Sequence, residues 1–293
     1  MARRDPLFAS EDEAREFAGR LGAAWVGARL RYFDTTDSTS IRARRLADLG
    51  WPEGTVVVAE EQTAGHGRLG RRWVCPARAG LLVSVVLPQP KRVSATWLTA
   101  AGALALAEAV EAPGRPGRAR HAGPLVEWPN DLVAPDPLVP SGRRKIGGVL
   151  VEARPPGAGL PPTAVLGAGL NVDTREEEFP PEIRSEAGSL VSVFGDAPRR
   201  RAILGRFLLG LETRIDGLAG GSAALEDELR RRSFTLGRDV DLPASAQDGD
   251  ARRGRAVGFD DDMRLVVKLP GGATEAVAFR SSDDPATGQG ESA

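Results

Sequence analysis

The chain has 293 residues, with 39 lysines and arginines against 40 aspartates and glutamates, so its net charge is −1 at pH 7. That length can bury a full hydrophobic core and a small second domain, whereas the charge balance disfavours a dedicated nucleic-acid binder, which usually carries a basic excess. The single cysteine, Cys75, cannot form an intramolecular disulfide, and no cysteine and histidine cluster has zinc-site spacing, so a reducing, cytoplasmic location is predicted.

The first half of the chain predicts alternating helices and strands. Ser10 and Glu13 form a capping-box pattern that opens a helix ending near Leu21, and the early charges exclude a secretory signal. The elements that follow are a helix at 41–49, strands at 55–59 and 81–87, and a helix at 96–110. The last of these overlaps an uncharged stretch that is too short to cross a membrane, which predicts a buried helix.

The second half of the sequence predicts more strands and two long helices, followed by short strands between polar turns. The predicted elements are strands at 125–127, 148–152 and 163–167, turns at 135–142 and 155–162, and helices at 198–218 and 223–232. Four short strands then follow, at 240–242, 255–258, 265–269 and 276–279. We therefore expect an α+β domain at 1–233, a small β-barrel domain at 234–283, and a polar, disordered tail at 284–293.

The segment from Glu60 to Trp73 reads EEQTAGHGRLGRRW and follows an apolar strand. Glycines at this density let the backbone approach a ligand and direct its N–H groups inward. Arginines beside them supply forked, permanently charged donors suited to phosphate or carboxylate. The glycines are Gly65, Gly67 and Gly70, and the arginines are Arg68, Arg71 and Arg72. The pattern indicates a loop that wraps an anion.

The glycine loop has rival interpretations. Its G-x-G-x-x-G spacing matches a dinucleotide-binding loop, which also needs a tight strand-to-helix turn and an acidic residue about 20 positions later. Five residues separate Ala59 from Gly65, Pro76 and Gly80 oppose a helix, and no acid lies at 85–90. No Walker-type pattern occurs. A solvated hairpin and a nucleic-acid contact remain open, although the charge balance weakens the second.

Four further segments combine polar or small residues with predicted strand and helix ends. They are Asp37-Ser38-Thr39-Ser40, Trp128-Pro129-Asn130-Asp131, Lys145-Ile146-Gly147-Gly148 and Gly167-Ala168-Gly169-Leu170-Asn171. Each has a structural alternative: a helix cap, an Asx turn, a surface lysine and a β-bulge, respectively. Taken singly, none of these segments decides a function.

Their joint order is specific. The succession DST…EEQTAGHGRLGRRW…WPND…KIGGVLVE…GAGLNV, from Thr35 to Leu170, resembles the biotin protein ligase family, also called biotin–[acetyl-CoA-carboxylase] ligase. The resemblance implies a mixed sheet with flanking helices, similar to class II aminoacyl-tRNA synthetase cores, followed by an SH3-like barrel. Some relatives carry an N-terminal DNA-binding domain. About 34 residues precede Thr35, where the resemblance begins, so a monofunctional enzyme that binds no DNA is predicted.

The resemblance also implies a two-step reaction. The biotin carboxylate attacks the α-phosphate of ATP, which gives biotinyl-5′-AMP and pyrophosphate, and a lysine of a biotin carboxyl carrier protein then takes the biotin. Mg²⁺ would screen the β- and γ-phosphates and needs no protein cage, because magnesium is often held largely by water and phosphate. A homodimer formed through sheet edges is allowed, and no membrane partner is expected.

Residue roles are implied by position in the matching motifs. The catalytic residues are Lys145, Arg68 and Asp131. The biotin-binding residues are Ser38, Thr39, Gln62, Gly65, His66, Gly67, Arg68, Lys145, Gly148 and Gly169. The residues that bind ATP or the adenylate are Arg68, Arg71, Trp73, Asn130, Lys145 and Asn171. No metal ligand is assigned, and we expect weak order in the loop before ligand binds.

Three positions depart from the family pattern. His66 stands where arginine is usual, Glu127 stands where lysine is usual, and the glycine–acidic pair near the last strand is replaced by Ala278-Phe279-Arg280. The first two changes remove positive charge, which predicts either a weaker hold on the nucleotide or a compensating local pair. Two other functions stay open: a biotin- or adenylate-binding regulator without turnover, and a lipoate-type acyl ligase of related fold.

Overall fold

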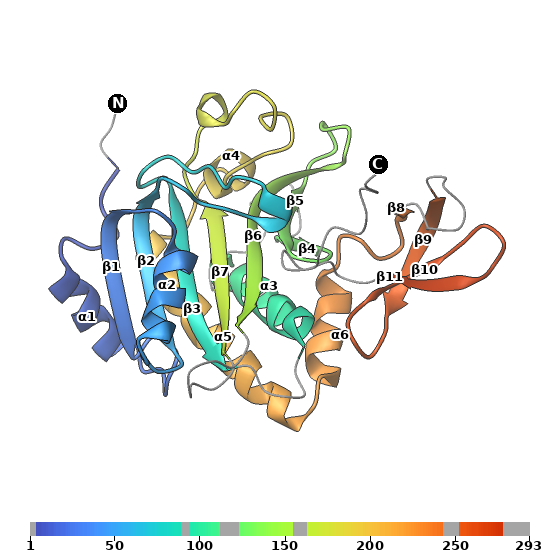
Figure 1. Cartoon of the computed structure of the whole chain (residues 1–293). Helices are drawn as coiled ribbons and strands as arrows, with labels where there is room; N and C mark the ends of the chain where they lie inside the picture. The colour runs from blue at the N-terminus through green and yellow to red at the C-terminus, as the bar shows by residue number, and fades with distance from the viewer. Residues whose placement is uncertain (1–3, 89–93, 112–122, 155–162, 243–251, 278–293) are drawn as a thin grey trace, which may run out of the picture.

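The computed structural model describes residues 4–88, 94–111, 123–154, 163–242 and 252–277, and it contains two β-sheets (Figure 1). The larger sheet has seven strands in the order β1-β2-β3-β7-β6-β5-β4. Strands β1 and β2 run parallel, and the other neighbouring pairs are antiparallel. The strands are β1 (Arg29–Thr36), β2 (Thr55–Gln62), β3 (Gly80–Pro88), β4 (Leu125–Glu127), β5 (Asp131–Pro135), β6 (Arg143–Arg154) and β7 (Thr163–Asn171). The mixed sheet expected from the sequence is confirmed.

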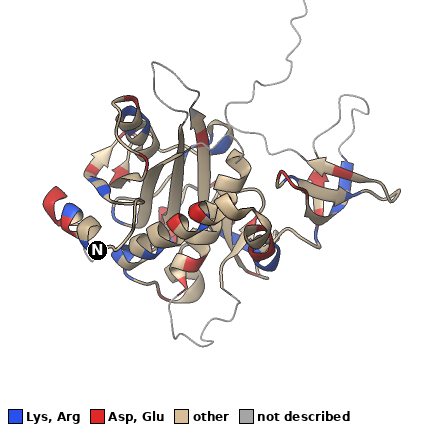
Figure 2. Ribbon diagram, turned by 90° about the horizontal axis from the view of Figure 1, so that it is seen from below, with Lys and Arg blue, Asp and Glu red and all other residues tan. Residues whose placement is uncertain are grey.

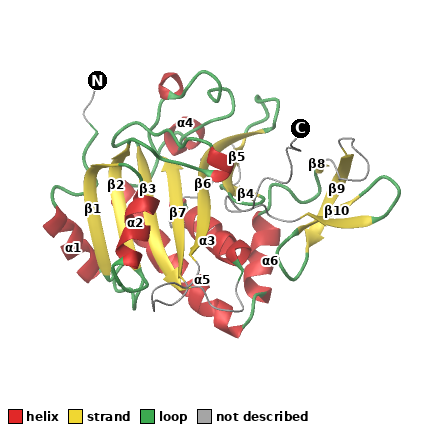
Figure 3. Cartoon of the chain, viewed as in Figure 1, coloured by secondary structure: helices red, strands yellow, loops and turns green. Residues whose placement is uncertain are grey.

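Helices cover both faces of the seven-stranded sheet (Figure 3). On one face, Ala43 and Ala47 of α2 pack against Val57, Val86 and Val165. On the other face, α3 and α5 pack against each other and against the sheet, and the main hydrophobic core lies there. The helices are α1 (Glu11–Arg20), α2 (Thr39–Asp48), α3 (Ala95–Val110), α4 (Leu190–Phe194), α5 (Arg200–Gly217) and α6 (Ala223–Arg232). Almost all of α3 is buried, as the uncharged stretch that forms most of it predicts.

The two predicted helix starts near the N-terminus differ slightly from expectation. The Ser10 hydroxyl accepts a hydrogen bond from the Glu13 N–H at 3.2 Å. The Glu13 carboxylate accepts from the N–H of Ala9 at 2.6 Å, one residue before the position that a capping box uses. Helix α2 begins at Thr39, two residues earlier than expected, because Ser38 is extended and already serves as its N-cap. Both helices are present where the sequence predicts them.

Several strands of the larger sheet are longer than predicted. Strand β2 continues to Gln62, β6 already begins at Arg143, and β7 continues to Asn171. Glycine and polar residues at these ends suggested loops, but the ladder between β6 and β7 extends through them. Lys145 therefore lies inside a strand. The turn expected at 155–162 lies outside the described residues.

The second sheet has four antiparallel strands in the order β11-β10-β9-β8. They are β8 (Asp239–Leu242), β9 (Arg252–Phe259), β10 (Leu265–Lys268) and β11 (Thr274–Val277). The sequence predicted a small SH3-like β-barrel in this region, and the described residues form a small antiparallel sheet there. The end of its predicted last strand and the polar tail lie outside the described residues.

The C-terminal sheet lies to one side of the main body (Figure 2) and packs on it through two tryptophans. The indole N–H of Trp97, on α3, donates to the Asp261 carbonyl at 3.3 Å. The indole N–H of Trp128, before β5, donates to the Met263 carbonyl at 3.2 Å. The backbone N–H of Trp128 also donates to the Thr235 hydroxyl at 2.8 Å. The turn that follows Trp128 is therefore fixed from the C-terminal side.

Glu212, on α5, fixes the segment that enters β1. Its carboxylate accepts backbone N–H groups from Ala24, Trp25 and Val26 at 2.9, 2.7 and 2.7 Å. Burial raises the pKa of Glu212, but the three N–H donors outweigh it, and the net direction is downward. A carboxyl group with a lowered pKa stabilises the fold above its unfolded pKa and loses that contribution as pH falls through its folded pKa.

Replacing Glu212 with glutamine is therefore expected to lower the free energy of unfolding at pH 7 by about 2 kcal/mol, because charged hydrogen bonds are lost. Urea melts at pH 7 and pH 3 measure the effect. The difference between the proteins should shrink at pH 3, below the ordinary glutamate pKa of about 4.3. Glu16→Gln, at an exposed α1 carboxylate, is the control. A difference that is equal at both pH values contradicts the assignment.

Candidate active site

The five motifs meet at one end of the larger sheet, on the face covered by α2. The glycine loop leaves β2 and crosses the ends of β7 and β6 toward β5, as the cyan segment in Figure 1 shows. Beneath it, Asp131, Gly148 and Gly169 are consecutive partners across β5, β6 and β7. Residues from distant parts of the chain are therefore gathered in one row.

The glycine loop folds back on itself between Gly65 and Trp73. The Gly67 N–H donates to the Arg71 carbonyl at 2.7 Å, and the Trp73 N–H donates to the Gly65 carbonyl at 3.0 Å. A Cβ atom at Gly65 would lie 2.8 Å from Nε2 of Gln62 and 2.9 Å from the Trp73 carbonyl oxygen, so only glycine fits there. The hairpin interpretation was correct about the backbone, and Arg71 lies exposed on it.

Arg68 and Lys145 extend toward the same row of residues. The Lys145 ammonium lies 2.7 Å from Oδ2 of Asp131, and the Arg68 guanidinium donates to Oδ1 of Asn130 at 3.2 Å. Burial lowers the pKa of Arg68, the Asp131 charge partly offsets this, and Arg71 adds to the lowering. A guanidinium nevertheless stays protonated in proteins. Two of the three residues predicted as catalytic are therefore cations fixed beside the third.

Lys145 is also held through its backbone. Its N–H donates to the Glu186 carbonyl at 2.7 Å, and its carbonyl accepts from the Gly188 N–H at 2.9 Å. The Asn171 side-chain amide donates to the Gly188 carbonyl at 3.0 Å. The segment 186–188 therefore connects Lys145 on β6 with Asn171 on β7. The sequence did not single out this segment.

Trp73 covers the floor of the site, which Gly148 and Gly169 form because neither has a side chain. A Cβ atom at Gly169 would lie 2.5 Å from Cε2 of the Trp73 ring, and one at Gly148 would lie 3.1 Å from Oδ1 of Asp131. The Lys145 ammonium lies 6.0 Å from the Trp73 ring centroid. The indole N–H of Trp73 is buried and has no hydrogen-bond partner among the described residues. Because Gly148 and Gly169 have no side chains, the space above them is open to the Trp73 indole.

Gly169→Ala is expected to raise the KM for the ligand that occupies this floor by about tenfold, because the new methyl group displaces Trp73 at an overpacked contact. The measurement is KM in the pyrophosphate-release assay described below. Gly19→Ala, on α1 where a Cβ meets no atom within 4 Å, serves as the control. An unchanged KM in Gly169→Ala would rule out a ligand position against β7.

A cluster of hydroxyl and amide groups lies beside the floor. Oε1 of Gln62 accepts hydrogen bonds from the Thr39 N–H at 2.7 Å and from the Thr39 hydroxyl at 3.0 Å. The Ser84 hydroxyl donates to Thr39 at 2.8 Å and lies 3.0 Å from the hydroxyl of Ser40. Ser38 is buried at the start of α2. Ser84 was not predicted from the sequence, although it is the one polar residue within the apolar run LLVSVV.

Both asparagines of the predicted nucleotide side bond to the protein itself. The Asn130 side-chain amide donates to the Val149 carbonyl at 2.8 Å, while its oxygen accepts from Arg68. The side-chain oxygen of Asn171 is buried without a hydrogen-bond partner among the described residues. The nucleotide contacts expected for these asparagines stay predictions, and the geometry adds a role for Asn130 in orienting Arg68.

The two charge departures have local partners. Oε2 of Glu127 lies 2.9 Å from Nε of Arg143, at the start of β6. Nε2 of His66 lies 3.5 Å from Oε2 of Glu152, which is also on β6. The compensating local pair anticipated from the sequence is therefore present at Glu127, and His66 has a carboxylate beside it.

Acidic and basic residues, red and blue in Figure 2, are interspersed along the ribbon, in line with the balanced composition. Across the described ranges, no helix combines the length and apolarity needed to cross a bilayer. Within the same ranges, no cluster of three or more histidine, cysteine or acidic side chains could hold a metal ion.

Comparison with solved structures identifies the fold. The biotin protein ligase from Aquifex aeolicus in complex with biotin and ATP superimposes with a TM-score of 0.67 at 24% sequence identity, over 85% of this chain and 95% of that chain. At this identity the likeness establishes the fold. The mixed sheet with flanking helices that the motifs implied is therefore confirmed, and a small antiparallel sheet occupies the region in which an SH3-like barrel was expected.

Sequence comparison identifies the family. The model of the Biotin/lipoate A/B protein ligase family matches residues 32–171. The biotin–[acetyl-CoA-carboxylase] ligase of Mycobacterium tuberculosis is 34% identical over 287 residues, which span 95% of this chain and 97% of that protein. The bifunctional ligase/repressor BirA of Bacillus subtilis is 29% identical over 83% of this chain and 70% of its own length. This chain belongs to the biotin/lipoate A/B protein ligase family, as its five ordered motifs indicated.

Proposed function

We propose that this protein activates biotin with ATP to form biotinyl-5′-AMP and pyrophosphate, and then transfers biotin to a lysine of a carboxyl carrier protein. The observation that carries the proposal is the convergence of Lys145 and Arg68 above the floor made by Gly148 and Gly169. The Mycobacterium relative carries the name of such a ligase and matches this chain over nearly its whole length, which supports the proposal.

The first step joins two anions, so the site must neutralise charge as the biotin carboxylate approaches the α-phosphate. Lys145 and Arg68 supply that charge from a partly enclosed position, where preorganised donors are worth about 10²–10³ in rate each. Lys145 carries a mobile ammonium that can exchange Asp131 for the ligand oxygens. Gln62 and Thr39 face the biotin ring, which needs both donors and acceptors.

Mg²⁺ bound with ATP would supply charge screening for the phosphates, and Asp131 is the residue that would help to hold it. Oδ1 of Asp131 is buried without a hydrogen-bond partner among the described residues, so it is a carboxylate oxygen that fits such an ion. The same carboxylate, once Lys145 moves to the ligand, can orient the acceptor lysine. That lysine must lose a proton before it attacks, because its ordinary pKa is near 10.4.

The partner that we propose is the biotin carboxyl carrier domain of a biotin-dependent carboxylase, in the cytoplasm. This choice rests on the acetyl-CoA carboxylase named for the Mycobacterium and Paracoccus relatives. The homodimer suggested by the family resemblance stays a prediction. The domain boundaries at 233 and 283 also stay predictions.

Lipoate is the competing substrate, because the family that matches this chain includes lipoate ligases. The protein is incubated with ATP, Mg²⁺ and either biotin or lipoate, and pyrophosphate release is followed. Release that depends on biotin supports the proposal, and release that depends on lipoate rejects it. Binding of biotin without any pyrophosphate would instead identify a regulator that lacks turnover.

A further inference from the structure

Glu152 is a buried carboxylate that the proposed reaction does not use. It lies on β6, four residues after Gly148, and its side chain is 10% exposed. Side chains alternate between the faces of a strand, so Gly148 and Glu152 face the same side of the sheet. Val165, the partner of Glu152 on β7, packs under α2, which places Glu152 on the ligand side.

The two oxygens of Glu152 have different surroundings. Oε1 accepts a hydrogen bond from Arg44 of α2 at 2.7 Å. Oε2 is buried, has no hydrogen-bond partner among the described residues, and lies 3.5 Å from Nε2 of His66 in the glycine loop. A small rotation of the imidazole would bring this pair to the N–H···O distance of about 2.7–3.2 Å. A buried carboxylate oxygen without a donor is unfavourable, so this approach is favoured.

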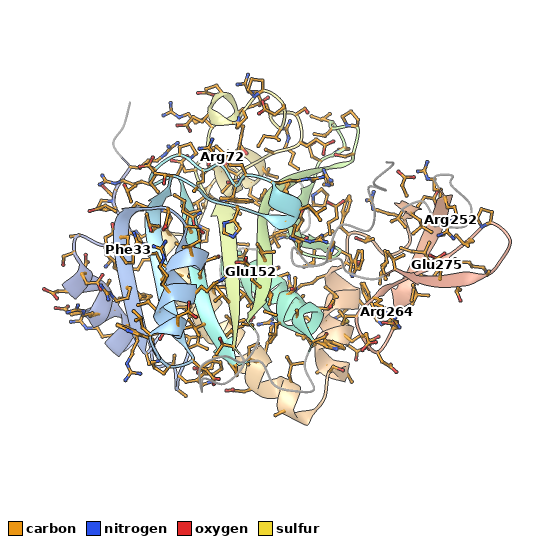
Figure 4. The ribbon with its side chains drawn as sticks, in the orientation of Figure 1. Phe33, Arg72, Glu152, Arg252, Arg264 and Glu275 are labelled. Atoms are coloured by element: carbon orange, nitrogen blue, oxygen red, sulfur yellow. The ribbon has the colours of Figure 1, made fainter. Side chains whose placement is uncertain are left out.

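A shift of His66 would be transmitted to the polar cluster. Gly65 precedes His66 and packs against the side-chain amide of Gln62 so closely that a Cβ atom would lie 2.8 Å from Nε2. Gln62 in turn accepts both hydrogen bonds from Thr39. Contacts therefore run from Glu152 through His66 and Gly65 to Gln62. Figure 4 labels Glu152 on the sheet and Arg72, the bridge partner of His66, in the loop above it.

We infer that Glu152 is a positioning residue that holds the glycine loop over the biotin ring by pairing with His66, while Arg44 anchors the same carboxylate to α2. The inference rests on the proposed function for its ligand, but the contact itself belongs to the unliganded chain. An arginine at position 66 would place a permanent positive charge beside the same carboxylate.

The first test needs no ligand. Arg71 and Arg72 are exposed in the loop, so trypsin reports how firmly the loop is held. Glu152→Gln keeps the size of the side chain and an acceptor for Arg44 but removes the charge that faces His66. Its cleavage at Arg71 and Arg72 should be about five- to tenfold faster than in the wild type, which corresponds to the loss of one net hydrogen bond. Cleavage at the wild-type rate overturns the inference.

The second test separates positioning from catalysis in the full-length enzyme. Glu152→Gln and His66→Gln should each raise the KM for biotin about five- to tenfold and leave kcat within about twofold, because the loop is displaced while Lys145 is untouched. The KM for biotin in the double variant should be no higher than in the single variant with the higher KM, because both substitutions remove the same contact. His66→Arg should keep the KM of the wild type or lower it.

Glu61→Gln changes a carboxylate on β2 that bonds only weakly, to Thr35 at 3.4 Å, and is the matched control. It should leave both trypsin cleavage and KM unchanged. Additive effects in the double variant, or a fall in kcat with unchanged KM, contradict the positioning role. Absence of biotin-dependent turnover in the wild type rejects the proposed function instead, and the trypsin comparison still decides the contact between His66 and Glu152.

Discussion

Replacing Lys145 with alanine is expected to lower biotin-dependent pyrophosphate release by about 10²–10³-fold, because one preorganised cation is lost from the site where two anions react. The ammonium lies 2.7 Å from Asp131, and the Lys145 backbone is held by hydrogen bonds to the segment 186–188. Because the side chain above this fixed backbone is flexible, the ammonium can follow the charge as it moves. An arginine at this position keeps the charge but not the compact, mobile donor, so Lys145→Arg should recover only part of the rate.

Two controls make the Lys145 prediction specific. Lys268→Ala removes an exposed lysine on β10 and should leave the rate unchanged. Lys145→Ala also leaves Asp131 without its cation, so the variant could lose activity because its fold is less stable and not because a reacting group is absent. The double variant Lys145→Ala with Asp131→Asn should restore stability but not activity. A rate within about threefold of the wild type in folded Lys145→Ala would remove this residue from the chemistry.

Replacing Glu60 with alanine is expected to lower the free energy of unfolding by about 3–5 kcal/mol, because it leaves the mostly enclosed guanidinium of Arg200 without its counter-charge. Glu60 is 3% exposed and lies 2.6 Å from the Arg200 guanidinium. It also accepts hydrogen bonds from the Tyr32 hydroxyl at 3.0 Å and from the Leu7 N–H. Burial, followed by the charge of Glu60, raises the pKa of Tyr32, so the phenol stays a donor.

The neighbouring glutamate supplies the comparison. Glu61 lies on the same strand but is partly exposed, so Glu61→Ala should change the free energy of unfolding by less than about 0.5 kcal/mol. Urea melts of both variants at pH 7 measure the difference. Equal, small losses in both would show that the group around Glu60 does not connect β2, α5 and the N-terminal segment.

The sequence predicted the larger elements because their patterns are strong. The uncharged segment that forms most of α3 has no polar face, and such a segment predicts a buried helix. The capping pattern at Ser10 located α1. The boundaries of β6 and β7 were missed because glycines normally weaken strands. In this fold, Gly148 and Gly169 are retained inside strands where the face must stay clear of side chains.

The candidate site was predicted as a set of motifs, and not as a set of contacts. That Lys145 meets Asp131 could not be read from the sequence, because the pair depends on the register between β5 and β6. The approach of His66 to Glu152 depends in the same way on how the loop crosses the sheet. Glu152 gave no signal of its own, since a glutamate at a strand end is usually solvated.

The most direct measurement of the central claim is transfer of biotin to a carrier. The protein, ATP, Mg²⁺ and biotin are mixed with the isolated carrier domain of a biotin-dependent carboxylase, and the modified residue is located by peptide mass spectrometry. We predict one biotin on the carrier lysine, none without ATP, and none when that lysine is replaced by arginine. A carrier that stays unmodified by folded wild-type protein, or that accepts lipoate in place of biotin, would contradict the account.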